Sequence, residues 1–183
     1  NIGNPLSIGN KTITWMNGRE LSSYQDSSNN ISYKYNLNGI RTSKIVNNIE
    51  TKYYLEGNKI VFENRNSTML YYLYNGDELL GFVYNGNTYY YHKNVFGDII
   101  GILNSNYEEI VTYEYDSWGA ISSVVDNSGI SLSTINPFRY RSYYYDEETK
   151  LYYLNSRYYN PEWGRFINED VYLSTGQGFE GFN

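Results

Sequence analysis

The stretch that decides the fold is Tyr113-Glu114-Tyr115-Asp116-Ser117-Trp118-Gly119-Ala120-Ile121. Tyr113 and Tyr115 are two residues apart, which is the spacing that places both rings on one face of a β-strand. The polar turn that follows ends in a glycine, and glycine supplies the positive φ that a tight hairpin turn requires. Ile121 then begins a returning strand. The stretch therefore predicts one β-hairpin.

The same order of a Tyr-rich run, a polar turn ending in glycine and an aliphatic residue recurs along the chain. The turn glycines of the six units are Gly18, Gly39, Gly57, Gly76, Gly97 and Gly119. Successive turn glycines are 21, 18, 19, 21 and 22 residues apart. A period of about 20 residues indicates a repeat architecture in which each hairpin buries its apolar face against its neighbours. We expect the tyrosines of adjacent hairpins to form cross-strand ladders with hydroxyls in contact with water.

Length and composition limit the class of protein. The 183 residues carry 20 acidic and 14 basic side chains, a net charge of −6, and no cysteine. Disulfides and thiolate metal sites are therefore excluded. The acidic balance argues against nucleic-acid and membrane-surface partners, and the absence of a long apolar run argues against membrane insertion. We expect one domain with no cofactor and no metal.

The residue types favour strands over helices. Alanine occurs once, at Ala120, while aromatic residues make up 19% of the chain, which is more than disordered segments carry. We therefore predict an all-β fold of tandem hairpins in a curved or spiralling antiparallel sheet. Because the sequence begins without Met, we also expect it to be a piece of a larger polypeptide.

The regular period changes at Asn136. Residues 136–170 include Leu151-Tyr152-Tyr153-Leu154-Asn155-Ser156-Arg157-Tyr158-Tyr159 and Gly164-Arg165-Phe166-Ile167. This block closely resembles the Rhs-associated core motif, which ends the Tyr-Asp repeat region of Rhs and wall-associated proteins. The residues that carry the motif, to which we assign a structural role, are Tyr143, Tyr145, Asp146, Leu151, Tyr153, Asn155, Arg157, Tyr158, Tyr159, Pro161, Gly164, Arg165 and Phe166.

The resemblance implies a function. In Rhs proteins, toxin-complex C proteins and teneurins, such repeats form a ribbon wound into a hollow shell, and in bacterial members the shell encloses a C-terminal toxin. It implies repeats over 1–135, the core motif over 136–170 and a Gly-rich lead-out over 171–183. The implied partners are the toxin domain of the parent polypeptide and neighbouring repeats, at a secreted or cell-wall location. Six or seven hairpins are too few for a whole shell, so we expect a partial shell or end plug.

The family's self-cleavage uses a pair of aspartates near the core motif. Asp170 matches the first of them, but no aspartate follows it before Asn183, and Val171 stands where the family often has proline. We therefore expect a non-catalytic chain. Part of an aspartyl autoprotease, with Asp170 as a catalytic residue, stays as an alternative.

Other candidate chemistry has simpler explanations. The run Gly176-Gln177-Gly178-Phe179-Glu180-Gly181 matches a dinucleotide-binding pattern. Only two residues follow it, which leaves no room for the helix that the pattern requires, so we interpret the run as a linker. His92 is the only histidine, which argues against a histidine metal cluster. The acidic runs, for which we expect solvated turns, are Glu108-Glu109, Asp146-Glu147-Glu148 and Glu169-Asp170.

Arginines and aromatic residues suggest further contacts. We expect Arg139, Arg141, Arg157 and Arg165 to stack on tyrosines or to pair with Asp146 and Glu162.

The aromatic repeats also leave open a carbohydrate-binding module, although the Gly-Trp pairs typical of cell-wall-binding repeats are missing. Unpaired edge strands favour an edge-to-edge homodimer.

Overall fold

The computed structural model describes residues 4–155 and 157–168 and is nearly all β. Its larger sheet has 13 antiparallel strands in the order of the chain. These strands are β1 (Ser7–Ile8), β2 (Lys11–Met16), β3 (Glu20–Gln25), β4 (Asn30–Tyr35), β5 (Arg41–Val46), β6 (Ile49–Glu56), β7 (Lys59–Arg65), β8 (Thr68–Asn75), β9 (Glu78–Tyr84), β10 (Asn87–Lys93), β11 (Ile99–Leu103), β12 (Glu109–Tyr115) and β13 (Ile121–Asp126).

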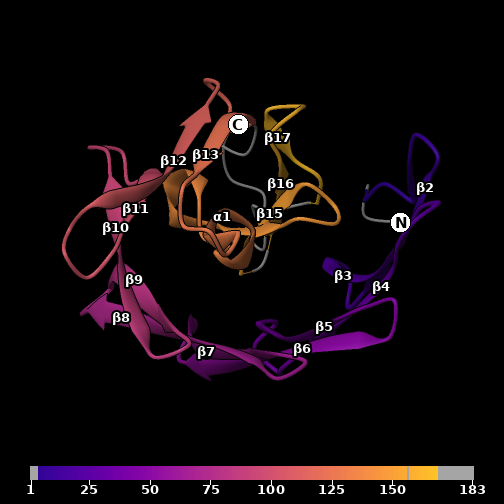
Figure 1. Cartoon of the computed structure of the whole chain (residues 1–183). Coiled ribbons are helices and arrows are strands. Elements are labelled where there is room, and N and C mark those ends of the chain that lie inside the picture. The colour runs from indigo at the N-terminus through magenta and orange to yellow at the C-terminus, as the bar shows by residue number, and fades with distance from the viewer. Residues whose placement is uncertain (1–3, 156, 169–183) are drawn as a thin grey trace, which may run out of the picture.

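The core motif forms a second, smaller sheet. Its four strands, in chain order, are β14 (Tyr144–Asp146), β15 (Leu151–Leu154), β16 (Arg157–Asn160) and β17 (Arg165–Phe166). A short helix α1 (Leu132–Ile135) and a 3₁₀ turn (Tyr140–Ser142) lead into it. Figure 1 shows the larger sheet curving around this smaller one, so the core motif occupies the hollow of the curve.

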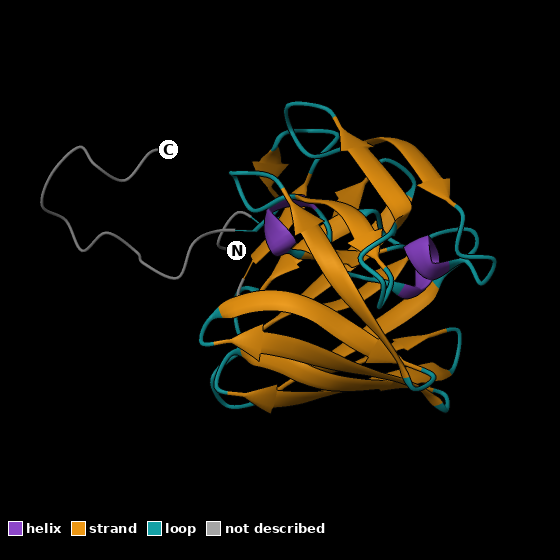
Figure 2. Cartoon of the chain, turned by 60° about the vertical axis from the view of Figure 1, so that its left-hand side comes forward, coloured by secondary structure: helices purple, strands orange, loops and turns teal. Residues whose placement is uncertain are grey.

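The prediction of tandem hairpins in a curved antiparallel sheet is confirmed. Each of the six units places its glycine in the turn between an even-numbered strand and the next, and all six glycines have positive φ. Within the described residues, β1 and β13 do not pair with each other, so the sheet stays open. Figure 2 shows the turns gathered at the two ends of the strands, as an antiparallel meander requires.

Four of the turns share one five-residue conformation, which begins at Asn36, Asn94, Asn104 or Asp116. In each, the Oδ1 atom of the first residue accepts hydrogen bonds from the backbone N–H groups two and four residues later, at 2.8 to 3.1 Å. A short acceptor side chain replaces a backbone carbonyl in such turns, which is why asparagine and aspartate are favoured there. The loops are therefore fixed by their own side chains.

Several tyrosine hydroxyls form hydrogen bonds within the protein, whereas the sequence predicted hydroxyls in contact with water. The second tyrosine of several repeats donates its hydroxyl to a carbonyl of an earlier strand, as Tyr35 does to Leu21, Tyr74 to Ile60 and Tyr115 to Ile99. An aromatic ladder does form on the convex face, where Phe62 lies 4.8 Å from Tyr54 and 4.6 Å from Tyr71 between ring centroids. The inward rings instead pack against the core motif.

Gly81, in the middle of β9, is a position where a side chain has no room. A Cβ atom there would lie 2.1 Å from the backbone oxygen of Tyr89 on the adjacent strand. We expect Gly81→Ala to lower the free energy of unfolding by about 1–3 kcal/mol, since the backbones must separate. Urea denaturation measures the loss.

Gly101→Ala is the matched control for this prediction. Its Cβ would meet the carboxylate of Glu109, a flexible, partly exposed side chain that can turn away, and would lie 3.1 Å from the backbone oxygen of Val111, a much looser approach than the 2.1 Å at Gly81. We expect a loss of less than about 1 kcal/mol. Equal losses for the two variants would contradict the close approach of β9 and β10.

Among residues 4–155 and 157–168, no helix has the length and apolar character needed to span a membrane.

Candidate functional site

The candidate functional site is the buried interface between the curved sheet and the core motif. Strand pairing places Tyr144, Tyr153 and Tyr158 opposite one another, so their rings share one face of the small sheet. That face meets the concave side of the larger sheet, where Tyr144 lies 5.5 Å from Tyr53 and Tyr158 lies 5.9 Å from Tyr33. The core motif is thus held by aromatic packing.

The Tyr-Tyr doublets of the motif supply two faces at once. The second face carries the row Tyr145, Tyr152, Tyr159 and Phe166, with successive centroids 4.8, 6.4 and 5.5 Å apart. Tyr152 is fully buried, and its hydroxyl donates to the carbonyl of Gly119 in the turn after β12. Because neighbouring residues of a strand point to opposite faces, each doublet contacts two parts of the molecule.

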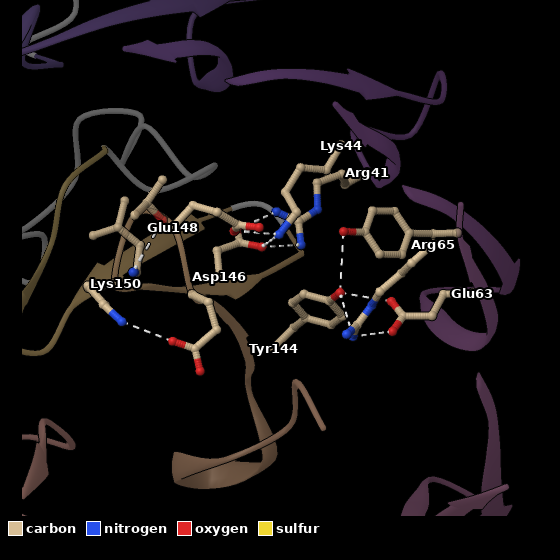
Figure 3. A network of polar contacts seen from close by, with 12 residues as sticks. Arg41, Lys44, Glu63, Arg65, Tyr144, Asp146, Glu148 and Lys150 are labelled. Atoms are coloured by element: carbon tan, nitrogen blue, oxygen red, sulfur yellow. Dashed lines mark hydrogen bonds and ion pairs between the residues drawn. The ribbon is translucent and has the colours of Figure 1, made fainter. Parts of the chain in front are cut away.

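A charged network lies at the centre of this interface (Figure 3). Arg41 of β5 donates to both carboxylate oxygens of Asp146, at 2.6 and 3.1 Å. Lys44 of the same strand donates to Asp146 at 2.9 Å and to Glu148 at 2.8 Å. The side chains of Arg41 and Asp146 are 0% exposed. Two cations of the sheet therefore meet two carboxylates of the core motif.

Aromatic rings enclose the Arg41 guanidinium. Its central carbon lies 5.5, 4.9, 5.0 and 4.2 Å from the ring centroids of Tyr33, Tyr53, Tyr144 and Tyr153. The electron-rich ring faces attract the cation, and a desolvated contact of this kind stabilises by about 2 kcal/mol. The backbone N–H of Arg41 also donates to the Tyr153 hydroxyl at 2.8 Å. Arg41 thus joins the two sheets through its ion pair with Asp146, through the contacts of its guanidinium with the tyrosine rings, and through its backbone N–H.

The charges determine the protonation states. Burial alone would raise the pKa of Asp146, but the adjacent Arg41 and Lys44 outweigh it and hold the pKa below its ordinary value of 3.8. Burial would lower the pKa of Lys44, and the facing Asp146 raises it well above the ordinary value. The pair is therefore ionised at neutral pH.

A second polar cluster continues the interface along β7. Glu63, which is fully buried, accepts hydrogen bonds from the hydroxyls of Tyr144 at 2.8 Å and Tyr72 at 2.7 Å. Arg65 pairs with Glu63 and donates to the carbonyl of Ile135 at 2.8 Å. Burial and the nearby Glu63 raise the pKa of Tyr144 well above its ordinary value, so this hydroxyl stays a donor. Figure 3 shows this cluster beside the first.

The prediction of solvated turns is wrong for Asp146, which is buried at the end of β14. Glu147 and Glu148 do lie in the turn after β14 and are partly exposed, but each pairs with a cation, Glu147 with Arg139 and Glu148 with Lys44. The expected partners were also wrong, since Asp146 pairs with arginine and lysine of the sheet rather than with an arginine of the motif. β14 ends at Asp146 beside the curved sheet, which places Asp146 and Glu148 against the cations of β5.

The core-motif arginines do lie over aromatic rings. Arg139 lies over Tyr113 and Tyr145, and Arg141 over Phe96 and Tyr140. Arg157 lies 3.9 Å from the Phe166 centroid, and Arg165 lies 5.3 Å from that of Trp163.

The remaining motif residues take several positions. Leu151 is buried, Asn155 has a φ of 56° after β15, and Tyr143 lines a hollow between the two sheets. Pro161 and Gly164 belong to the turn that precedes β17.

Other sequence candidates lie away from this interface or outside the described residues. His92 and Glu109 are 2.7 Å apart on exposed strand positions, and Glu108 is exposed. Within residues 4–155 and 157–168, no group of three or more His, Cys, Asp or Glu side chains could hold a metal. Asp170, Glu169 and the run from Gly176 to Gly181 lie outside the described residues.

Acid should weaken the interface. A carboxyl whose pKa is lower in the folded than in the unfolded state stabilises above its unfolded pKa and loses that effect as pH falls through the folded pKa. Asp146 and Glu147 both have lowered values. We expect the urea midpoint to fall as pH drops below about 5. The pH slope should be smaller in Asp146→Asn, and an unchanged slope would contradict this assignment.

Comparisons with known proteins agree with this architecture. A family model described as Teneurin YD-shell matches residues 59–179. The chain is 34% identical over 176 residues to the tRNA3(Ser)-specific nuclease WapA of Bacillus spizizenii, an alignment that covers 92% of this chain and 7% of the relative. It is also 38% identical over 58 residues to double-stranded DNA deaminase toxin A of Burkholderia cenocepacia, covering 31% of this chain and 4% of that protein.

Solved structures show the same fold. The crystal structure described as TcdB2-TccC3-TEV matches with a TM-score of 0.75 at 22% identity, covering 92% of this chain and 9% of that chain. The chain thus spans less than a tenth of the length of these relatives. On the family match over 59–179 and the shared curved sheet, the chain belongs to the teneurin YD-shell family of Rhs/YD-repeat proteins and is a segment of their structural shell.

Proposed function

We propose that this segment forms wall and end plug of a shell that encloses or presents a C-terminal toxin of the same polypeptide, at a secreted or cell-surface location. The observation that carries the proposal is that the core motif fills the hollow of the curved sheet and is fixed there by buried ion pairs. Because the core motif occupies the concave side of the sheet, it blocks passage through that part of a shell. This arrangement suits the end of a shell rather than a middle section that leaves room for cargo.

The names of the relatives favour a toxin as cargo. Two of them are described as a tRNA nuclease and a DNA deaminase toxin, which are different chemistries, and both contain a region similar to this chain. A constant wall beside variable cargo accounts for that combination. In the parent polypeptide, further repeats would continue the sheet from the outer edge of β1, and the cargo would follow the core motif.

The first test is to read the open reading frame beyond both ends of residues 1–183. Many Tyr-rich repeats before Asn1 and an unrelated domain after Asn183 are expected. A free-standing short gene would contradict the proposal and would favour a small aromatic binding module.

The second test is protease protection in the parent polypeptide. The segment downstream of residue 183 should resist protease when it is attached to the shell, and should be cut rapidly when expressed alone. Asp146→Asn, which weakens the plug, should speed cleavage of the downstream segment. Equal cleavage with and without the shell would contradict enclosure.

A further inference from the structure

The last strand of the curved sheet leaves an open edge. Within the described residues β13 pairs with β12 alone, and Figure 1 shows it at the end of the sheet. The chain then turns away, because the Asp126 carboxylate accepts hydrogen bonds from the backbone N–H groups of Ser128 at 2.9 Å and Ser133 at 2.8 Å. The next strand, β14, belongs to the smaller sheet. Residues 4–155 and 157–168 therefore supply no strand that covers this edge.

The backbone of β13 directs hydrogen-bonding groups outward at a position that the register defines. The N–H of Asn127 donates to the carbonyl of Ile110 at 2.8 Å, and Val124 lies opposite Tyr113. In an antiparallel pair, hydrogen-bonded and non-hydrogen-bonded positions alternate along the strand. Because Asn127 is a hydrogen-bonded position, Val124, three residues earlier, is not bonded to β12. Its N–H and C=O therefore point away from the sheet.

The side chains of β13 are open to solvent on both faces of the sheet. Val124 is 42% exposed and Val125 is 50% exposed, and neighbouring residues of a strand point to opposite faces. On the adjacent strand, by contrast, the inward Val111 and Tyr113 are buried. A strand added beside β13 would cover both valines and remove their apolar surface from water.

Proteins commonly protect the edges of their sheets, and β13 lacks this protection. Very short edge strands, proline and lysine are the usual devices. The other end of the sheet has two of them, since β1 is two residues long and Pro5 lies just before it. β13 has six residues, with neither proline nor lysine among them. Of the two ends, β13 is therefore the one suited to accept a strand.

The charges beside this edge are balanced. The hollow next to Val124, of about 380 Å³, is lined by Arg139 and Lys150 together with Glu147 and Glu162. The charged residue of β13 itself is Asp126. A second molecule that brings the same edge therefore meets both signs of charge there, although the chain as a whole has a net charge of −6.

We infer that β13 pairs with β13 of a second copy of this chain, around a two-fold axis that passes between the two Val124 residues. Antiparallel pairing about this axis lets each Val124 exchange both backbone hydrogen bonds with its own copy. The register then places Val125 opposite Ser123 of the second copy and Asp126 opposite Ser122 of the second copy, so no like charges meet. Two curved sheets thus become one continuous sheet.

Disulfide trapping tests the pairing and its register, because the chain has no cysteine of its own. In Val124→Cys the two thiols lie opposite each other, with Cα atoms about 5.5 Å apart, a distance that a disulfide spans. In Val125→Cys each thiol lies about 7–8 Å from its own copy, at or beyond that span. With oxidised glutathione, we expect Val124→Cys to form a covalent dimer on a non-reducing gel at least about tenfold faster than Val125→Cys.

Sedimentation equilibrium measures the association of the unaltered chain. One strand pair is a small interface, so the association is weak. We expect the average mass to rise from 21.4 kDa towards twice that value as the concentration is raised to about 1 mM. Val124→Lys places two like charges opposite each other and should keep the chain monomeric. Met69→Lys, at a similarly exposed position on β8, should leave dimerisation unchanged.

Three results would overturn the inference. A mass that stays at 21.4 kDa over the whole range would mean that the edge remains unpaired. Dimerisation of Val124→Lys equal to that of the unaltered chain would place the interface elsewhere, and equal trapping at positions 124 and 125 would contradict the two-fold axis at Val124. The urea midpoint of each variant shows that it is folded. The pairing needs only the edge of β13, so its failure leaves the shell, which protease protection tests, unaffected.

Discussion

Asp146→Asn is expected to lower the free energy of unfolding by about 3–5 kcal/mol. The substitution removes the negative charge that pairs with the buried Arg41, and it removes one of the two carboxylates that pair with Lys44. Asparagine has nearly the same shape as aspartate, so the loss reports charge rather than volume. Both side chains of the Arg41–Asp146 pair are fully buried, so solvent does not screen the change. Urea denaturation followed by circular dichroism measures the loss.

Asp77→Asn is the matched control for this charge removal. Asp77 pairs with Lys59 at 2.6 Å, but its side chain is 97% exposed. Exposed ion pairs contribute little to stability, so the urea midpoint should hardly change. Similar losses in the two variants would contradict a buried, unscreened network at Asp146.

Tyr158→Ala is expected to lower the free energy of unfolding by about 3–5 kcal/mol, the range for removing a large aromatic side chain from a core. Tyr158 is 1% exposed and packs against Tyr33 of the curved sheet and Tyr153 of the core motif. Its hydroxyl lies 2.8 Å from that of Tyr35. Removal of the ring therefore opens a cavity between the two sheets.

Two control variants separate ring, hydroxyl and position. Tyr158→Phe removes only the hydroxyl contact and should cost about 0.5–1.5 kcal/mol. Tyr54→Ala removes a half-exposed ring from the convex face and should cost about 1 kcal/mol. A loss at Tyr158→Ala no larger than that at Tyr54→Ala would mean that the core motif does not fill the hollow in solution.

The hairpins could be predicted from the sequence because their signals are local. Alternating tyrosines set the strand faces and the turn residues set the reversals, so all six units were found from patterns of fewer than ten residues. The position of residues 136–168 could not be predicted in this way, because no local pattern states which surface a small sheet will pack against. The sequence allowed this block to be recognised as the core motif, through its resemblance to the family, but did not show where it packs.

The buried charges were missed, although the sequence holds a signal for them. Directly opposed residues of an antiparallel hairpin share a face, and the register pairs Tyr35 with Arg41 and Tyr33 with Lys44. Tyr53 is opposite Glu63 in the same way. Charged residues opposite inward tyrosines therefore point into the concave side. What the pattern cannot supply is their partner, since Asp146 lies 105 residues from Arg41 in the sequence.

The most direct test of the account is a double-mutant cycle between Arg41 and Asp146, because it measures whether the curved sheet and the core motif are joined through these two side chains. Arg41→Met, Asp146→Leu and the double variant are compared with the unaltered chain by urea denaturation. We predict a double variant more stable than Asp146→Leu alone, since removing both partners leaves fewer unpaired buried charges. Effects that add to within about 0.5 kcal/mol would contradict the contact and with it the plug.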